Sequence, residues 1–333
     1  MPVLSGGYLH PSDRKALQLL GHGRNSVEIH ARDGAGRVDL VALDRRLAEL
    51  AAPAVVIASA GEVDTGDFDP LADLADIAER HGAWLHVDGA FGIFAALSPR
   101  TAGLVAGMER ADSIAGDGHK WLNVPYESGF AFLKDPSRLP VAFGMPGAAY
   151  LPGAGSALPT PGEGADYALL GPDSSRRARS LPIWATLAAY GRDGYRSMVE
   201  RHLDLAQRLA RRVDETPELQ RLAEVPLCIV CFRARPAGVP EEALDEVNRR
   251  LGGPCSPTAG CTPAPPSTMD AWRCARRSST GVPPRPTSTC CSTWSANSPR
   301  RWPPSSVEGG CIHRPESGRS NGRDDKSRIW SHR

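Results

Sequence analysis

The chain of 333 residues lacks a surplus of either charge, since 39 lysines and arginines face 38 aspartates and glutamates. A net charge of +1 provides no electrostatic attraction to nucleic acid or to an anionic membrane, so we expect neither as a partner. Runs of 18 or more apolar residues are also absent, and residues 1–15 contain no apolar segment typical of a secretory signal. These absences predict a soluble, cytoplasmic protein.

Cysteine is scarce before residue 253, where only Cys228 and Cys231 of the eight in the chain occur. Their C-x-x-C spacing is found in redox and metal sites, but here it falls in the apolar run PLCIVCF. Because a cysteine outside a disulfide packs like a small apolar side chain, we interpret both as core residues. We predict no metal site.

Leucine and phenylalanine are missing from the whole segment after Leu251, where twelve prolines and six cysteines occur instead. Such a composition buries too little apolar area to offset the entropy lost on ordering. Residues 253–333 are therefore predicted to be either a disordered tail or, as we prefer, the product of out-of-frame translation.

Between residues 14 and 250, by contrast, helical and strand patterns alternate. Helices are predicted at residues 40–50 and at 69–82, the second with Asp69 as its N-cap and Gly82 just past its end. Strands are predicted at residues 53–61, 84–90 and 129–135, and residues 111–121 are predicted to be a strand that runs into a loop. This alternation indicates an α/β fold with a largely parallel sheet covered on both faces. Residues 171–252, with two helical stretches and the strand PLCIVCFRA, predict a smaller α/β domain after a large domain at 1–170.

Asp88 lies at the end of an apolar strand, in WLHVDGAFG, where α/β sheets bind their ligands. An aspartate there can also cap the next turn. Lys120 follows Gly118 and His119 at a similar transition from strand to loop, further along the chain. A lysine in a partly desolvated pocket forms Schiff bases, and an aspartate facing a pyridinium nitrogen accompanies it in pyridoxal phosphate sites. We therefore predict pyridoxal 5'-phosphate as the cofactor. His86 shares a strand face with Asp88 and is interpreted as a supporting or core histidine.

Three motifs carry a resemblance to a known family: HVDGAFG, ADSIAGDGHKWLNVPYESG and AGEVDTGDFDP. They resemble the group II pyridoxal-phosphate-dependent amino acid decarboxylases, which include the aromatic-amino-acid and glutamate decarboxylases. The resemblance runs from about Ser5 to about Gly252. It implies an incomplete fold of type I, the aspartate-aminotransferase-like architecture, with residues 1–170 as a partial cofactor-binding domain.

The same resemblance implies roles for individual residues. Lys120 corresponds to the lysine that holds the cofactor as a Schiff base, and Asp88 to the partner of its pyridinium nitrogen. Ala90 would pack on one face of the ring, and His10, in YLHPSDRKA, would stack on the other. Val63 stands where many members of the family have a threonine near the ring.

Two further residues follow from the resemblance. His119 would lie near the cofactor phosphate or the substrate carboxylate. Either Tyr150, in AAYLP on a mobile loop, or a water held by His119 would return a proton to the substrate. The implied reaction converts an L-amino acid to its amine and carbon dioxide through Lys120, in a homodimer. The family's phosphate-binding turn belongs to an N-terminal portion that we expect to be missing from this chain.

Two other interpretations stay open. Class V aminotransferases and cysteine desulfurases also combine a strand aspartate with a His-Lys pair, but they generally follow the lysine with Gly-Pro, whereas Trp121 and Leu122 follow it here. Alternatively, the chain is an inactive, truncated relic of a decarboxylase. A visible spectrum with pyridoxal phosphate distinguishes the relic from an enzyme.

Overall fold

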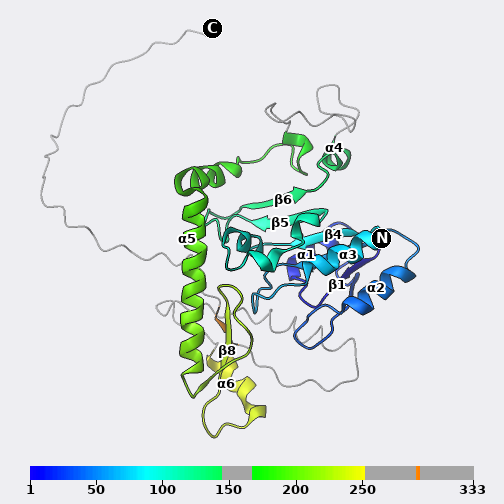
Figure 1. The fold of residues 1–333 in the computed structure, drawn as a ribbon. Helices are drawn as coiled ribbons and strands as arrows, with labels where there is room; N and C mark the ends of the chain where they lie inside the picture. Colours follow the sequence, from blue (N-terminus) through cyan, green and yellow to red (C-terminus); the bar gives the residue numbers. More distant parts are fainter. Residues whose placement is uncertain (145–166, 252–289, 293–333) are drawn as a thin grey trace, which may run out of the picture. The chain divides into compact units, whose positions relative to one another are not determined.

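The computed structural model describes residues 1–144 and 167–251, and the backbone of residues 290–292. A six-stranded sheet in the order β2-β1-β3-β4-β5-β6 organises the first part of the chain (Figure 1). The first five strands in this order are parallel to one another, and β6 is antiparallel to β5. The strands are β1 (Val3–Ser5), β2 (Val27–Ile29), β3 (Val55–Ser59), β4 (Trp84–Asp88), β5 (Ser113–Asp117) and β6 (Gly129–Leu133). The predicted largely parallel sheet is confirmed.

Helices connect the first four parallel strands along the chain. They are α1 (Pro11–Leu19), α2 (Leu40–Glu49) and α3 (Leu71–His81). Between β4 and β5 the chain instead makes three short 3-10 turns, at Gly92–Leu97, Ala102–Val105 and Met108–Arg110. The helices predicted at residues 40–50 and 69–82 are therefore both confirmed, because their apolar spacing matches the buried face that each presents to the sheet.

Side chains of successive strand residues point to opposite faces of the sheet, and the two faces are covered by different elements. Val56 and Val87 belong to the main core, which also contains the buried leucines of α2 and α3. Ile57 points the other way, into a smaller cluster with Leu17 of α1. Asp88 alternates with Val87 and so lies on the face of the sheet opposite to the main core. This alternation decides which residues can reach the site described below.

Asp69 is not the N-cap of α3, contrary to the sequence prediction. Pro70 occupies the cap position, without a side-chain hydrogen bond. Asp69 turns away instead, and its carboxylate accepts a hydrogen bond of 2.8 Å from the backbone nitrogen of Ser59 at the end of β3. The prediction was wrong because a strand end that needed an acceptor competed for this carboxylate. At the other end of α3, Gly82 adopts the left-handed conformation that terminates the helix (φ 62°), as predicted.

After β6 come α4 (Arg138–Phe143), a 3-10 turn at Tyr167–Leu169, and the long helix α5 (Ser180–Asp214) (Figure 1). Gly191 interrupts α5 with φ 60° and ψ −175°. Helix α5 therefore consists of two helical stretches, as the sequence predicted. A three-stranded antiparallel sheet follows, built from β7 (Leu219–Arg221), β8 (Val230–Ala234) and β9 (Cys290–Ser292). The 3-10 turn Glu241–Ala243 leads into α6 (Leu244–Leu251).

Cys228 and Cys231 are packed into the protein, in agreement with the prediction. Cys231 is buried, and burial raises the pKa of the Cys228 thiol to about 12, so Cys228 stays protonated at neutral pH. The division into domains at residues 170 and 252 stays a prediction. Apart from the backbone of β9, residues 253–333 lie outside the described part of the chain.

Candidate active site

The ends of four parallel strands bring the predicted site residues together. The loops after β1, β3, β4 and β5 all leave from the carboxyl edge of the sheet, and their side chains enclose one small pocket. The pocket is lined by Tyr8, His10, Ser59, Gly61, Glu62, Val63, Asp88, Ala90, Phe91 and Lys120. Of the six residues to which the resemblance gives a role, four therefore lie around the same space, namely His10, Asp88, Ala90 and Lys120, together with Val63.

Asp88 ends β4, where it pairs with Ser59 of β3 and Ala115 of β5. Its Oδ1 accepts a hydrogen bond of 3.0 Å from the backbone nitrogen of Ala90, which fixes the carboxylate at the mouth of the strand. His86, two residues earlier on the same face, is bonded through Nδ1 to the Ser113 hydroxyl at 2.8 Å. Burial lowers the pKa of His86, so it is a neutral, hydrogen-bonded core histidine outside the pocket lining, as interpreted.

Lys120 reaches the pocket from the loop after β5. Its Nζ lies 3.2 Å from Oδ2 of Asp117, the last residue of that strand. The same ammonium lies 5.9 Å from the centre of the Phe91 ring, within the range of a cation–π contact. The side chain is about one-third exposed, so the ion pair with Asp117 orients the amine more than it stabilises the fold.

His10 closes the pocket from the start of α1. Its Nδ1 accepts hydrogen bonds from the backbone nitrogen of Ser12 (3.2 Å) and from the Ser12 hydroxyl (2.6 Å), which makes His10 the N-cap of the helix. An accepting Nδ1 leaves the proton on Nε2. Burial lowers the pKa of His10, against the opposing charge of Asp88, so the ring is neutral at neutral pH. A neutral imidazole fixed by a helix start is suited to stacking on a flat ligand.

His119 lies beside the pocket rather than in its lining. Its Nδ1 is bonded to the backbone of Ser128, 2.8 Å from the carbonyl oxygen, and its ring packs on Tyr126 with centroids 4.1 Å apart. Its Nε2 is 3.7 Å from Asp117, the partner of Lys120. Its predicted role near a phosphate or a substrate carboxylate stays a prediction. Tyr150 lies outside the described residues, and its role also stays a prediction.

Helix α5 supports the segment that carries Lys120. Trp121 is buried, and its Nε1 bonds to His202 of α5, while the Tyr195 hydroxyl of the same helix donates to the Leu122 carbonyl oxygen at 3.0 Å. The two residues after Lys120 are thus held by side chains from a distant part of the sequence.

Several carboxyl groups near the pocket were not singled out from the sequence. Burial raises the pKa of Glu62 to about 7, and the neighbouring charge of Asp64 adds to this shift. Burial likewise raises the pKa of Asp13, in the first turn of α1, to about 7, with the charge of Asp88 as the next cause. Perturbed carboxyl groups of this kind gather at functional sites.

Other contributors to the pocket that the sequence analysis missed are Tyr8, Phe91 and Asp117. Tyr8 stands two residues before His10 and Phe91 directly follows Ala90, so proximity to the predicted residues was the only available signal. Asp117 stands three residues before Lys120, at the end of a predicted strand. A carboxylate at a strand end is the same signal that selected Asp88, and it could have selected Asp117 from the sequence.

Comparison with known proteins identifies the family of the chain that carries this pocket. Residues 32–235 match the model of the pyridoxal-dependent decarboxylase conserved domain. The chain belongs to this family. The resemblance recognised in HVDGAFG and GDGHKW is therefore confirmed.

Individual relatives of this decarboxylase-family chain agree. It is 29% identical to an aromatic-L-amino-acid decarboxylase of Bacillus atrophaeus, over 73% of the chain and 51% of that protein. It is 30% identical to an L-2,4-diaminobutyrate decarboxylase of Acinetobacter baumannii, over 75% of the chain and 49% of that protein. The chain thus spans about half the length of the curated relatives it matches.

Solved structures place the decarboxylase-family chain in fold type I, as predicted. Mouse CSAD aligns with a TM-score of 0.64 and 28% identity, over 75% of this chain and 54% of that one. The Oryza sativa TDC, solved with PLP and tryptamine, aligns with a TM-score of 0.67 and 25% identity, over 75% and 52% of the two chains.

The pocket of the decarboxylase-family chain fits the ring end of pyridoxal phosphate. It offers a lysine amine, a carboxylate at a strand end, a neutral imidazole and a small alanine side chain, which are the groups that a protonated pyridine aldehyde requires. Apart from His10, Lys120 is the only basic residue among the described residues of the lining. A further cationic side chain to pair with the cofactor phosphate is therefore not found among the described residues of that lining. No described helix is long and apolar enough to span a membrane.

Proposed function

We propose that this chain provides the catalytic centre of an amino acid decarboxylase that uses pyridoxal phosphate and releases an amine and carbon dioxide. The observation that supports it best is the convergence of His10, Asp88, Ala90 and Lys120 on one pocket, in a chain that belongs to the decarboxylase family. When bound, the cofactor supplies an electron sink for the bond that breaks.

In this proposal each residue acts through the contact that it makes. Asp117 directs the Lys120 amine toward the pocket, where that amine binds the cofactor covalently. The Asp88 carboxylate, fixed at the end of β4, can hold a proton on a pyridine nitrogen. His10, neutral and fixed by Ser12, covers one side of the ring, and Ala90 leaves space on the other.

Proton return to the substrate is assigned to Tyr150, by resemblance. His119, whose Nε2 faces the same Asp117 oxygen as the Lys120 amine, is assigned to the substrate carboxylate or the cofactor phosphate on the same ground. The substrate is an L-amino acid that the sequence does not name. A cytoplasmic location also belongs to the proposal, and fractionation of cells that express the chain tests it.

Cofactor binding is tested with the purified chain and pyridoxal phosphate. We expect a visible absorption band, and after borohydride reduction a cofactor mass on the peptide that contains Lys120. Lys120→Ala should lose both signals, while Lys134→Ala, which removes an exposed lysine of the same sheet region, should keep them. A wild-type chain without the band would favour the relic.

Reaction type is tested separately, with a panel of L-amino acids. Release of carbon dioxide supports the decarboxylase, whereas transfer of the amino group without carbon dioxide would support a class V aminotransferase. Sulfur release from cysteine would support a desulfurase. Lys120→Ala serves as the control for activity that does not depend on the cofactor.

We further propose a homodimer, supported by exposed apolar side chains on the first stretch of α5. Four large apolar residues there are exposed: Leu181, Trp184, Leu187 and Tyr190. Light scattering after size exclusion should give twice the chain mass, and Trp184→Arg should reduce it to a monomer. Leu205→Arg, elsewhere on α5, should leave the mass unchanged. An equally monomeric wild type would refute this part of the proposal.

A further inference from the structure

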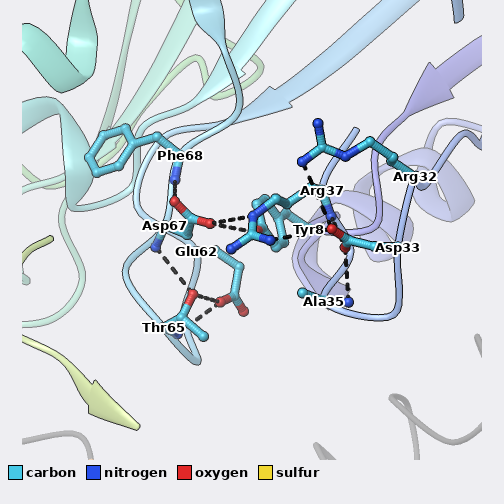
Figure 2. Close-up of polar contacts among 9 residues, drawn as sticks. All are labelled: Tyr8, Arg32, Asp33, Ala35, Arg37, Glu62, Thr65, Asp67 and Phe68. Carbon is cyan, nitrogen blue, oxygen red and sulfur yellow. Dashed lines mark hydrogen bonds and ion pairs between the residues drawn. The ribbon is translucent and has the colours of Figure 1, made fainter. Parts of the chain in front are cut away.

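Tyr8 joins two walls of the pocket. It stands two residues before His10, in the wall formed by the loop after β1, and it is buried with 8% exposure. Its hydroxyl donates a hydrogen bond of 2.7 Å to Oδ2 of Asp67, which belongs to the loop after β3 (Figure 2). That second loop carries Glu62 and Val63, which line the pocket from the other side. Tyr8 therefore connects two segments that are distant in the sequence.

Internal hydrogen bonds hold the loop after β3 together, so a displacement of one of its residues displaces the others. The Glu62 carboxylate accepts a hydrogen bond of 2.8 Å from the backbone nitrogen of Asp64. It also accepts one of 2.8 Å from the backbone nitrogen of Thr65 and one of 3.0 Å from the Thr65 hydroxyl (Figure 2). The backbone nitrogen of Glu62 donates to the Asp67 carbonyl oxygen at 2.8 Å. This backbone bond couples the two ends of the turn. The position of Asp67 therefore sets the position of Glu62 in the pocket wall.

On its outer side, Asp67 meets a third loop. Arg37 Nε lies 3.4 Å from the same Asp67 oxygen that Tyr8 uses, and Arg37 Nη1 lies 3.3 Å from Asp33 (Figure 2). These groups are one-third to one-half exposed, so water screens their attraction and their contribution is small. The donor of the other bond, Tyr8, is buried, so water replaces this donor less readily than it replaces Arg37.

The phenol of Tyr8 is a permanent hydrogen-bond donor and not an acid or base. Burial raises its pKa further above the ordinary value, and the bond to Asp67 adds to the effect. The group therefore keeps its proton at neutral pH and contributes here through the position that its hydrogen bond fixes.

We propose that Tyr8 is a positioning residue, whose bond to Asp67 sets the separation between the pocket wall of His10 and the wall of Glu62 and Val63. This inference rests on the proposed function, since the ligand whose orientation it controls is pyridoxal phosphate.

The test compares Tyr8→Phe, Asp67→Ala, the double variant and wild type, each with pyridoxal phosphate. Titration gives the dissociation constant, and the circular dichroism of the bound cofactor reports the orientation of its ring. We expect the dissociation constant to rise about tenfold in either single variant, the value that one lost buried hydrogen bond gives, with a weaker dichroic band. Asp67→Ala also removes the contacts of Asp67 with Phe68 and Arg37. The double variant should therefore match Asp67→Ala, because Tyr8→Phe removes only a bond that Asp67→Ala has already removed.

Arg32→Gln is the matched control, because Arg32 is exposed and its guanidinium reaches Asp33, at 3.9 Å, in the outer part of the same network. It should bind the cofactor as wild type does. Thermal unfolding of every variant shows whether an effect comes from general loss of stability, and Asp67→Ala keeps the test valid if Tyr8→Phe does not fold. An unchanged constant and an unchanged dichroic band in both single variants would overturn the inference alone. Absence of cofactor binding in wild type would overturn the proposed function and the inference together.

Discussion

The indole nitrogen of Trp121 donates a hydrogen bond of 3.1 Å to Nδ1 of His202, and the two rings are stacked, 18° from parallel with centroids 6.4 Å apart. An imidazole can accept there only when it is neutral, and burial lowers the pKa of His202, which favours that form. Because Trp121 directly follows Lys120, this contact attaches the segment of Lys120 to helix α5.

Replacing His202 by alanine should leave the buried Trp121 N–H without an acceptor. An unsatisfied buried donor costs about 1–3 kcal/mol, so the free energy of unfolding in urea should fall by that amount. Cofactor attachment to Lys120, followed by borohydride trapping, should also slow. Arg201→Ala changes the exposed neighbour on the same helix and is the control. If both variants unfold at the same urea concentration as wild type, the bond contributes nothing measurable.

Asp88→Asn separates the charge of this residue from its hydrogen bond. Asparagine can still accept from the Ala90 nitrogen, so unfolding should change by less than about 1 kcal/mol. The anion needed by a protonated pyridine is lost, and affinity for pyridoxal phosphate, measured by absorbance titration, should fall at least about tenfold. Asp112→Asn removes a carboxylate that accepts from Leu85 at the opposite end of β4, and it should leave the affinity unchanged. Equal affinities in the two variants would contradict the role given to Asp88.

Asp69 should make the folded protein less stable as pH rises. Burial raises its pKa from 3.8 to about 7, so between these values the folded chain holds a proton that the unfolded chain has lost. The contribution of Asp69 to the free energy of unfolding is complete below its unfolded pKa. It disappears as the pH rises through its folded pKa, a change on the order of 4 kcal/mol.

The measurement is the difference in unfolding free energy between wild type and Asp69→Asn, followed from mildly acidic to mildly alkaline pH. Asp13 and Glu62 shift in the same direction and the buried histidines His10 and His86 in the opposite one, so only the difference isolates Asp69. Wild type should lose its relative advantage between pH 3.8 and about pH 7, and the difference should then stay constant at alkaline pH. A difference that is independent of pH would show that Asp69 is ionised in the folded protein.

Gly92→Ala should disrupt the turn behind the pocket. A methyl group at this position would overlap the Ala60 carbonyl oxygen and lie 2.8 Å from the Gly61 nitrogen, both of them backbone atoms that cannot rotate away. We expect a loss of at least about 2 kcal/mol in chemical denaturation, together with weaker cofactor binding. Gly103→Ala is the matched control, since nothing lies within 4 Å of its added methyl group. Comparable losses in the two variants would contradict the steric conflict, since Gly→Ala at a compatible position is expected to stabilise the fold by lowering the entropy of the unfolded chain.

The part of this fold that the sequence predicts is the part written in local patterns. Helix α3 follows from its apolar spacing and Gly82, and the parallel sheet from the alternation of strands and helices. Asp88 and Lys120 could be selected because each combines an unexpected charge with a strand end. Asp69 was misassigned since a helix start and a strand end compete for the same carboxylate, and the sequence does not show which is closer.

The cross-loop contacts could not be predicted in the same way. Tyr8 and Asp67, or Lys120 and its support from His202, become neighbours only through the strand order and through the path of α5. Sequence periodicity does not indicate such pairs, because each residue fits its own local pattern without its partner. The chemical groups of the pocket were therefore predictable, but the contacts that hold them in place were not.

The strand order has a consequence for how the protein reaches its working form. His10 and Lys120 lie far apart in the chain, and they meet only after β1, β3, β4 and β5 have all paired in register. Parallel pairings over such separations form slowly, since the intervening chain must close first. A chain that has collapsed without completing them presents no site. In a refolding experiment, the amount of bound pyridoxal phosphate would then measure the fraction of completely folded chains. We expect it to rise later than the helix content.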